Sequence, residues 1–126
     1  MQVLVVDDEV DMCTLFQQRF RKELKTHQIS LAFATSGQEA LHYLRQNATE
    51  SITILSDINM PGMSGLELLK TIKQEFEVPP RDVIMITAYG DNENYQRAIN
   101  LGARDLLTKP LDFALLRQKL HLENLS

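Results

Sequence analysis

The chain has 126 residues and a mass of 14.4 kDa, which suits one domain and is too short for two of ordinary size. Its composition, 44% hydrophobic and 24% charged with a single cysteine, argues against a disordered protein and against a disulfide-stapled scaffold. Acidic residues outnumber basic ones by 17 to 13, and the resulting net charge of −4 disfavours binding to nucleic-acid phosphates. The sequence shows no membrane-length apolar run and no signal peptide, so we expect one cytoplasmic domain over residues 1–126.

Strand-like and helix-like patterns alternate from the first residues onward. The first predicted strand, 2–6, is followed by a helix whose apolar residues recur at helical spacing. We expect one continuous helix with an apolar stripe made by Cys13, Phe16, Phe20 and Leu24. Its opposite face is predicted to lie in water and to mix Glu23 with the basic residues Arg19, Arg21, Lys22 and Lys25.

A second strand at 29–33 and a third at 52–56 each lead into a further helix. A Ser-x-x-Glu spacing marks the start of both helices, because the serine accepts from the third helical amide while the glutamate reaches back. The two pairs are Ser36 with Glu39 and Ser64 with Glu67.

The fourth strand is predicted at 83–86 and the fifth at 105–108. Between them, a helix should open at Asp91, run to Leu101 and stop at Gly102, since glycine takes the left-handed conformation cheaply. The third and fourth strands are apolar almost throughout, which is typical of strands covered by helices on both faces. With a last helix that carries Phe113, Leu116 and Leu120, the pattern predicts five consecutive βα units and a parallel sheet.

Polar residues follow the predicted strands, at the carboxyl edge where open parallel sheets bind their ligands. Carboxylates at neighbouring strand ends repel one another, and a hard divalent cation with oxygen ligands is the usual remedy, so we expect Mg²⁺. A carboxylate beside such a cation, with a hydroxyl and an ammonium aimed at the same point, suits phosphoryl transfer. The residues concerned are Asp7, Asp8 and Glu9 after the first strand, Asp57 after the third, Thr87 after the fourth and Lys109 after the fifth.

Four segments together resemble the receiver domain of two-component response regulators, and the resemblance covers essentially the whole chain. It implies a doubly wound, flavodoxin-like α/β fold with five parallel strands in the order 2-1-3-4-5. The segments, all at strand ends and in the expected order, are Val5-Val6-Asp7-Asp8-Glu9, Asp57-Ile58-Asn59-Met60-Pro61-Gly62-Met63-Ser64-Gly65, Ile86-Thr87-Ala88 and Thr108-Lys109-Pro110.

By this resemblance, Asp57 is the phosphoacceptor and takes its phosphoryl group from a phosphohistidine of a sensor kinase or a histidine phosphotransfer protein. Asp8 and Asp57 are implied to be direct Mg²⁺ ligands, Asp7 a water-mediated ligand, and the backbone carbonyl of Asn59 a third protein ligand. The resemblance thus implies a signalling switch that catalyses only its own phosphorylation and dephosphorylation.

The resemblance also assigns the switch residues. Thr87, with the small Ala88 beside it, resembles the hydroxyl that closes on the new phosphoryl oxygen. Lys109 resembles the lysine that pairs with that oxygen. Pro110 follows it, and in the family this peptide bond is typically cis.

Two positions set this chain apart from the family. Receivers usually carry Tyr or Phe where this chain has Leu106, so the coupling between phosphorylation and the output face should be altered or weaker. Tyr89 lies where family members tune the access of water to the phosphoryl group. We expect its ring to shield a long-lived acyl phosphate and to supply the moving aromatic group.

The expected partners follow from the same resemblance. A phosphohistidine donor should dock over Val10, Leu15 and the Pro110-Leu111 loop. The signal should leave through the helix opened by Asp91, the strand at 105–108 and the last helix, toward an output domain or a target protein. A dimer that forms on phosphorylation is left open, whereas nucleic acid and membranes are not expected as partners.

Three other functions fit these residues less well. A phosphatase of the haloacid-dehalogenase type needs a second aspartate two residues after the nucleophile, where this chain has Asn59. A flavin binder needs a phosphate loop after the first strand, where Asp7-Asp8-Glu9 would repel a phosphate. A receiver-like module that takes no phosphate would usually lack an acid or the lysine.

The scattered His27, His42 and His121 have no metal-binding spacing and are expected at the surface.

Overall fold

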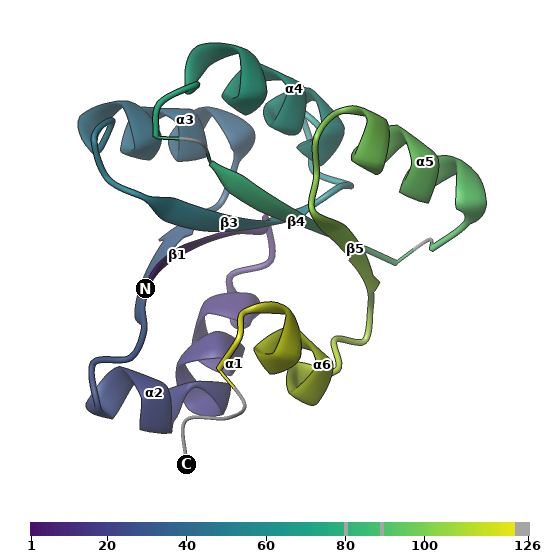
Figure 1. Ribbon diagram of the computed structural model, residues 1–126. Helices are drawn as coiled ribbons and strands as arrows, with labels where there is room; N and C mark the ends of the chain where they lie inside the picture. The colour runs from purple at the N-terminus through teal and green to yellow at the C-terminus, as the bar shows by residue number, and fades with distance from the viewer. Residues whose placement is uncertain (80, 89, 123–126) are drawn as a thin grey trace.

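The computed structural model describes residues 1–79, 81–88 and 90–122 and places one parallel sheet between two layers of helices (Figure 1). The strand order β2-β1-β3-β4-β5 confirms the doubly wound, flavodoxin-like fold implied by the resemblance. The strands are β1 (Gln2–Val6), β2 (Ser30–Ala34), β3 (Ile52–Asp57), β4 (Asp82–Thr87) and β5 (Asp105–Thr108). The helices within the described residues are α1 (Asp11–Arg19), α2 (Arg21–Lys25), α3 (Gly37–Gln46), α4 (Gly65–Glu75), α5 (Asn92–Asn100) and α6 (Phe113–Lys119).

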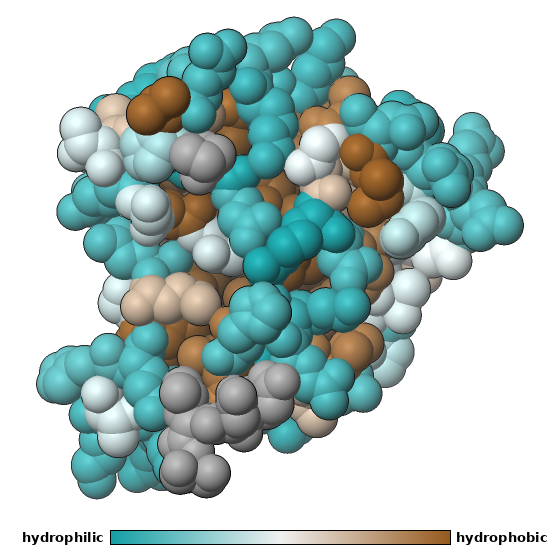
Figure 2. Space-filling model, viewed as in Figure 1, coloured by the Kyte–Doolittle hydropathy of each residue, from teal (hydrophilic) through white to brown (hydrophobic). Residues whose placement is uncertain are grey.

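Each face of the sheet has its own hydrophobic core, because successive side chains of a strand point to opposite faces. Leu4 and Val6 of β1 belong to the core under α3, α4 and α5, whereas Val3 and Val5 belong to the core against α1, α2 and α6. Hydrophilic side chains cover most of the surface seen in Figure 2, and hydrophobic ones show through mainly between the two helical layers. Within the described residues, no helix is long and apolar enough to span a bilayer.

The predicted helix starts are confirmed at three positions. The side chains of Ser36, Ser64 and Asp91 accept hydrogen bonds from the backbone N–H three residues on, at 3.1, 3.2 and 2.8 Å. The Glu39 carboxylate, expected to reach back to Ser36, accepts instead from the Thr35 hydroxyl. Gly102 follows α5 with φ of +104°, the conformation for which glycine was expected there.

The prediction of one continuous first helix is wrong, because the backbone leaves the helical region at Phe20 and separates α1 from α2. At this break an Arg117 guanidinium N–H of α6 donates to the carbonyl of Arg19. A second N–H of Arg117 donates to the Glu23 carboxylate at 3.0 Å, and the guanidinium lies 4.9 Å from the centre of the Phe20 ring. The side chain of Arg117 therefore contacts residues on both sides of the break and stabilises it.

The prediction that Glu23 lies on the solvent face is also wrong. The residue is only 7% exposed, because Arg117 draws its carboxylate toward α6. Its Oε1 atom is buried and has no hydrogen-bond partner among the described residues. The four basic residues around the break are exposed as predicted, and so are the three histidines.

Two arginines cross-link the amino ends of the strands. Arg81, directly before β4, is 1% exposed and donates to the carbonyls of Asn47, Ala48 and Pro79 while it stacks on Phe76. Arg104, directly before β5, forms an ion pair with Asp82 at 2.8 Å and donates to the carbonyl of Lys119. Lys119 in turn pairs with Asp105 at 2.7 Å, so the end of α6 is tied to the start of β5.

Candidate functional site

The register of the sheet brings four of the predicted site residues to one edge. Val6 pairs with Ser56, Asp57 with Ile86, and Thr87 with Thr108. The strands are parallel, so the residues at and just after these pairs lie at the same carboxyl edge. Asp7, Asp57, Thr87 and Lys109 therefore come from four strand ends to one place.

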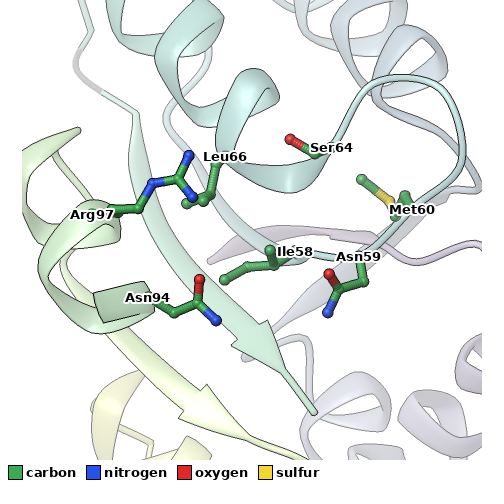
Figure 3. A pocket seen from close by; sticks show the side chains of 7 residues that line it. All are labelled: Ile58, Asn59, Met60, Ser64, Leu66, Asn94 and Arg97. Atoms are coloured by element: carbon green, nitrogen blue, oxygen red, sulfur yellow. The ribbon is translucent and has the colours of Figure 1, made fainter. Parts of the chain in front are cut away.

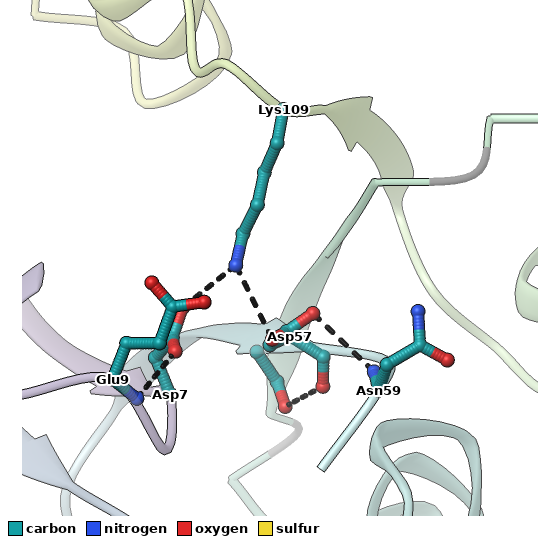
Figure 4. A network of polar contacts seen from close by, with 6 residues as sticks. Asp7, Glu9, Asp57, Asn59 and Lys109 are labelled. Carbon is teal, nitrogen blue, oxygen red and sulfur yellow. Dashed lines mark hydrogen bonds and ion pairs between the residues drawn. The ribbon is translucent and has the colours of Figure 1, made fainter.

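The Lys109 ammonium lies between two buried carboxylates (Figure 4). Its Nζ is 3.2 Å from Oδ2 of Asp7 and 3.3 Å from Oδ2 of Asp57. Asp7 is 6% exposed and Asp57 is 5% exposed, while Asp8 lies at the surface. The single cation thus offsets two charges that would otherwise repel each other in a partly dry site.

The backbone fixes the other oxygen of each buried carboxylate. The Glu9 N–H donates to Oδ1 of Asp7 at 2.9 Å, and the Asn59 N–H donates to Oδ1 of Asp57 at 3.3 Å (Figure 4). The start of α4 packs directly beneath Asp57, where a Cβ on Gly65 would lie 2.1 Å from the Asp57 carbonyl oxygen. Only glycine fits at this position, and it holds the loop that carries Asn59 close to the site.

Burial raises the pKa of Asp57 above its ordinary value of 3.8, and the neighbouring Asp7 carboxylate acts in the same direction. The charge of Lys109 and the Asn59 N–H oppose this rise without cancelling it. For Lys109, burial would lower the pKa, but the hydrogen bond to Asp7 and the charge of Asp57 outweigh burial and raise the pKa above 10.5. The site therefore disfavours the charged form of the Asp57 carboxyl group, which is an electrostatic strain, and favours the protonated form of Lys109.

This strain predicts that Asp57→Asn stabilises the metal-free protein at neutral pH. The folded pKa of Asp57 is raised, so its favourable contribution is complete below about pH 3.8 and is lost as the pH rises through the folded pKa. Urea denaturation in EDTA should give a larger free energy of unfolding for the variant at pH 7, with the difference shrinking toward pH 3.5. A variant less stable than the native chain at pH 7 would contradict this.

The three acidic residues that were predicted to hold a metal do converge. One carboxylate oxygen from each of Asp7, Asp8 and Asp57 lies within 4.8 Å of the other two. Two of these side chains are buried and one is exposed, which leaves the cluster open toward solvent. An all-oxygen donor set with one open side fits Mg²⁺, which keeps several of its water ligands.

The predicted switch residues lie around this cluster. Thr87 is fully buried, Ala88 is exposed, and the carbonyl of Thr87 accepts from the Lys109 N–H at 2.8 Å. The peptide bond between Lys109 and Pro110 is cis, as the resemblance implied. Leu106 is half-buried and packs against the core under α3, α4 and α5. Tyr89 lies outside the described residues, and its shielding role stays a prediction.

Sequence reasoning missed a pocket beside the site. It has a volume of about 460 Å³ and lies between the loop after β3 and helix α5 (Figure 3). Asn59 lines it, so the pocket and the acidic cluster share one loop. The sequence carries no signal for it, because Arg97, the charged residue in its wall, is an ordinary residue for an exposed helix.

The family model and the relatives of known sequence indicate the same protein family. The family model for the response regulator receiver domain matches residues 3–121. Response regulator RppA of Synechocystis sp. is 34% identical over 120 residues, which cover 95% of this chain and 49% of RppA. The chain therefore spans about half the length of this relative.

Solved structures agree with the sequence match. A chain in the CheX-CheY-BeF3-Mg²⁺ complex from Borrelia burgdorferi is 30% identical with a TM-score of 0.83, and the match covers 95% of this chain and 86% of that one. A chain in the complex of the Saccharomyces cerevisiae histidine phosphotransfer protein Ypd1 with the receiver domain of Ssk1 is 27% identical with a TM-score of 0.80. That match covers 94% of this chain and 85% of that one.

Proposed function

Because this chain belongs to the receiver-domain family of response regulators, we propose that it is a phosphorylation-activated switch with Asp57 as its phosphoacceptor. The phosphoryl group comes from a phosphohistidine on a histidine kinase or a histidine phosphotransfer protein. The observation that carries the proposal is the placement of the Lys109 ammonium between the buried carboxylates of Asp7 and Asp57. This arrangement supplies a nucleophile and a fixed positive charge at one point.

In the proposed transfer, an oxygen of the Asp57 carboxylate attacks phosphorus in line with the histidine nitrogen. The P–N bond breaks as the P–O bond forms, and the departing imidazole takes up a proton from solvent. The Lys109 ammonium, which lies 3.3 Å from Asp57 before transfer, moves to an oxygen of the new phosphoryl group. The Thr87 hydroxyl donates to another oxygen of that group and so reports the phosphorylated state to its surroundings.

Asp7, Asp8 and Asp57, together with the backbone carbonyl of Asn59, are the residues proposed to hold Mg²⁺. When bound, the cation offsets negative charge on the transferred group and its acceptor. The convergence of the three carboxylates supports this assignment, and Asp7 and Asp57 are the members whose carboxylates are already paired with Lys109.

Labelling of the chain by acetyl phosphate should therefore depend on magnesium. Phosphorylation adds roughly 1.5 to 2 negative charges to an already acidic cluster, so a divalent cation is needed to offset them. Intact-mass measurement should find one added phosphoryl group with Mg²⁺ and none with excess EDTA. Equal labelling in both solutions would remove the metal from the proposal.

The domain, proposed to extend over residues 1–126, acts as a signalling module whose catalysis is limited to its own phosphorylation and dephosphorylation. The phosphohistidine donor docks over Val10, which is 66% exposed at the start of α1, over Leu15, and over the Pro110-Leu111 loop. An output domain or target protein receives the signal, and a phosphorylation-dependent dimer is one form this could take. The unpaired Cys13 suits the proposed cytoplasmic location.

The signal is proposed to leave through α5, β5 and α6, with weaker coupling because Leu106 replaces an aromatic residue. Beryllofluoride with Mg²⁺ should shift amide NMR signals over these three elements in the native chain. Because a larger ring gains more contacts when it fills a buried gap, Leu106→Tyr should enlarge the shifts on β5 and α6. Shifts confined to α3 would place the output face elsewhere.

A further inference from the structure

The pocket beside the acidic cluster has a wall of hydrogen-bond donors and an apolar floor. Figure 3 shows Arg97 and Asn94 of α5 facing the loop after β3 across the opening. Ile58, Met60 and Leu66 supply the apolar part of the lining. The polar part comes from Asn59, Ser64, Asn94 and Arg97, and none of the described residues contributes a carboxylate to the lining.

Arg97 is the charged group of this pocket. Its guanidinium extends across the opening toward Leu66 (Figure 3). No carboxylate of the described part of the chain lies within ion-pair distance of it, whereas Arg45, Arg104 and Arg117 each have such a partner. The positive charge of Arg97 therefore faces the pocket with no counter-charge from the residues that the structure describes.

The donors of the pocket suit one class of ligand. A guanidinium offers a planar pair of N–H donors that matches the two oxygens of a carboxylate. Ser64 already accepts from the Glu67 N–H, which leaves its O–H to donate, and the exposed carboxamide of Asn59 supplies a further N–H donor. A short aliphatic or aromatic body can cover the floor made by Ile58, Met60 and Leu66.

We propose that this pocket binds an organic carboxylate that carries a small apolar body, with Arg97 as its principal anchor. The carboxylate belongs either to a free acid or to an acidic side chain of another protein. The ligand reaches the loop that positions Asp57, because Asn59 lines the pocket and its N–H donates to Oδ1 of Asp57. The proposal goes beyond the phosphoacceptor function and does not depend on it.

The test is a titration of the full chain with phenylacetate, followed by amide NMR signals. Phenylacetamide serves as the neutral analogue, and an amide-blocked Leu-Glu-Leu peptide serves as the protein-like carboxylate. Arg97→Gln removes the anchor at an exposed position, so folding should be unaffected. The matched control is Arg21→Gln, because Arg21 is also exposed and lies on the opposite helical layer.

Phenylacetate should shift the amides of residues 58–66 and 94–97 saturably. Its affinity should fall about fivefold in Arg97→Gln, by the scale of a partly exposed charge pair, and stay unchanged in Arg21→Gln. Phenylacetamide should bind correspondingly more weakly. Arg97-dependent binding of the peptide would assign the carboxylate to a protein side chain, and binding of phenylacetate alone would assign it to a free acid.

Equal affinity in the native chain and in Arg97→Gln would overturn the proposal, and so would shifts scattered over unrelated surface residues. Repeating the titration in Asp57→Asn keeps the two hypotheses separate. Pocket binding should persist in that variant whether or not Asp57 is the phosphoacceptor.

Discussion

Replacing Asp57 by asparagine should abolish phosphoryl labelling of the chain by acetyl phosphate and Mg²⁺. Asparagine keeps the shape of the side chain and can still accept from the Asn59 N–H, but its amide is not a nucleophile. Asp7 offers a second buried carboxylate beside Lys109, yet it comes from β1 and its other oxygen is held by the Glu9 N–H. Intact mass after incubation should therefore show one phosphoryl group on the native chain and none on the variant.

Asp105→Asn is the matched control for this experiment. Asp105 begins β5 at the opposite edge of the sheet and pairs with Lys119, so its replacement should leave labelling unchanged. Labelling of Asp57→Asn at the native rate would move the phosphoacceptor to another residue. If Asp57→Asn were labelled on Asp7, the Asp7 carboxylate could replace that of Asp57 as the phosphoacceptor.

The second large effect is expected at the buried ion pair of Glu23 and Arg117. Arg117→Met should lower the free energy of unfolding at pH 7 by about 2 to 3 kcal/mol, because it leaves a buried carboxylate without its cation. This loss of free energy is smaller than the loss expected for a fully buried pair, since 28% of the Arg117 side chain is exposed. Adding Glu23→Gln should recover most of this loss, because the double variant no longer buries an uncompensated charge.

The free energy of unfolding that Arg117→Met loses should become smaller as the pH falls. Burial alone would raise the pKa of Glu23, but the hydrogen bond and charge of Arg117 hold it below its ordinary value of 4.5. In the native chain Glu23 therefore contributes stability above about pH 4.5, and this contribution is lost as the pH falls through the folded pKa. Urea denaturation should show the deficit of Arg117→Met shrinking between pH 7 and pH 4.

Arg45→Met is the comparison for an exposed pair. Arg45 and Glu75 form a two-pronged ion pair on the surface between α3 and α4, and its loss should change stability little at any of these pH values. If Arg117→Met were no more destabilising than Arg45→Met, the buried pair would contribute nothing beyond a surface one.

The fold was predictable because its signals are local. The strand pattern at 2–6, the serine caps and Gly102 each reflect a short-range preference that the tertiary structure preserves. The convergence of Asp7, Asp57 and Lys109 was also predictable, since parallel strands bring their carboxyl ends to one edge. Their individual roles rest on resemblance and stay predictions.

The wrong predictions share a cause, because each concerns a local feature that depends on a side chain far away in the sequence. The helix break at Phe20 and the burial of Glu23 both depend on Arg117, which lies 94 residues beyond Glu23 in the sequence. Helical periodicity continues smoothly through that region, so a local pattern could not reveal the break. The pocket at Arg97 was missed for a similar reason, because it is formed by a loop and a helix from separate βα units.

The arginine cross-links lie at the amino ends of β4 and β5, and the acidic cluster lies at the carboxyl ends of the strands. These two ends of the sheet should tolerate amino-acid replacements differently. Arg81 and Arg104 link several backbone carbonyls and a carboxylate at the edge of the sheet opposite the acidic cluster. Replacements there should reduce the yield of folded protein. Replacements of exposed residues at the carboxyl edge should leave the fold intact while they alter its chemistry. An engineer who wishes to retarget this domain can therefore vary the exposed loop residues around Asp57, provided that Gly65, Arg81 and the carbonyl partners of Arg81 are kept.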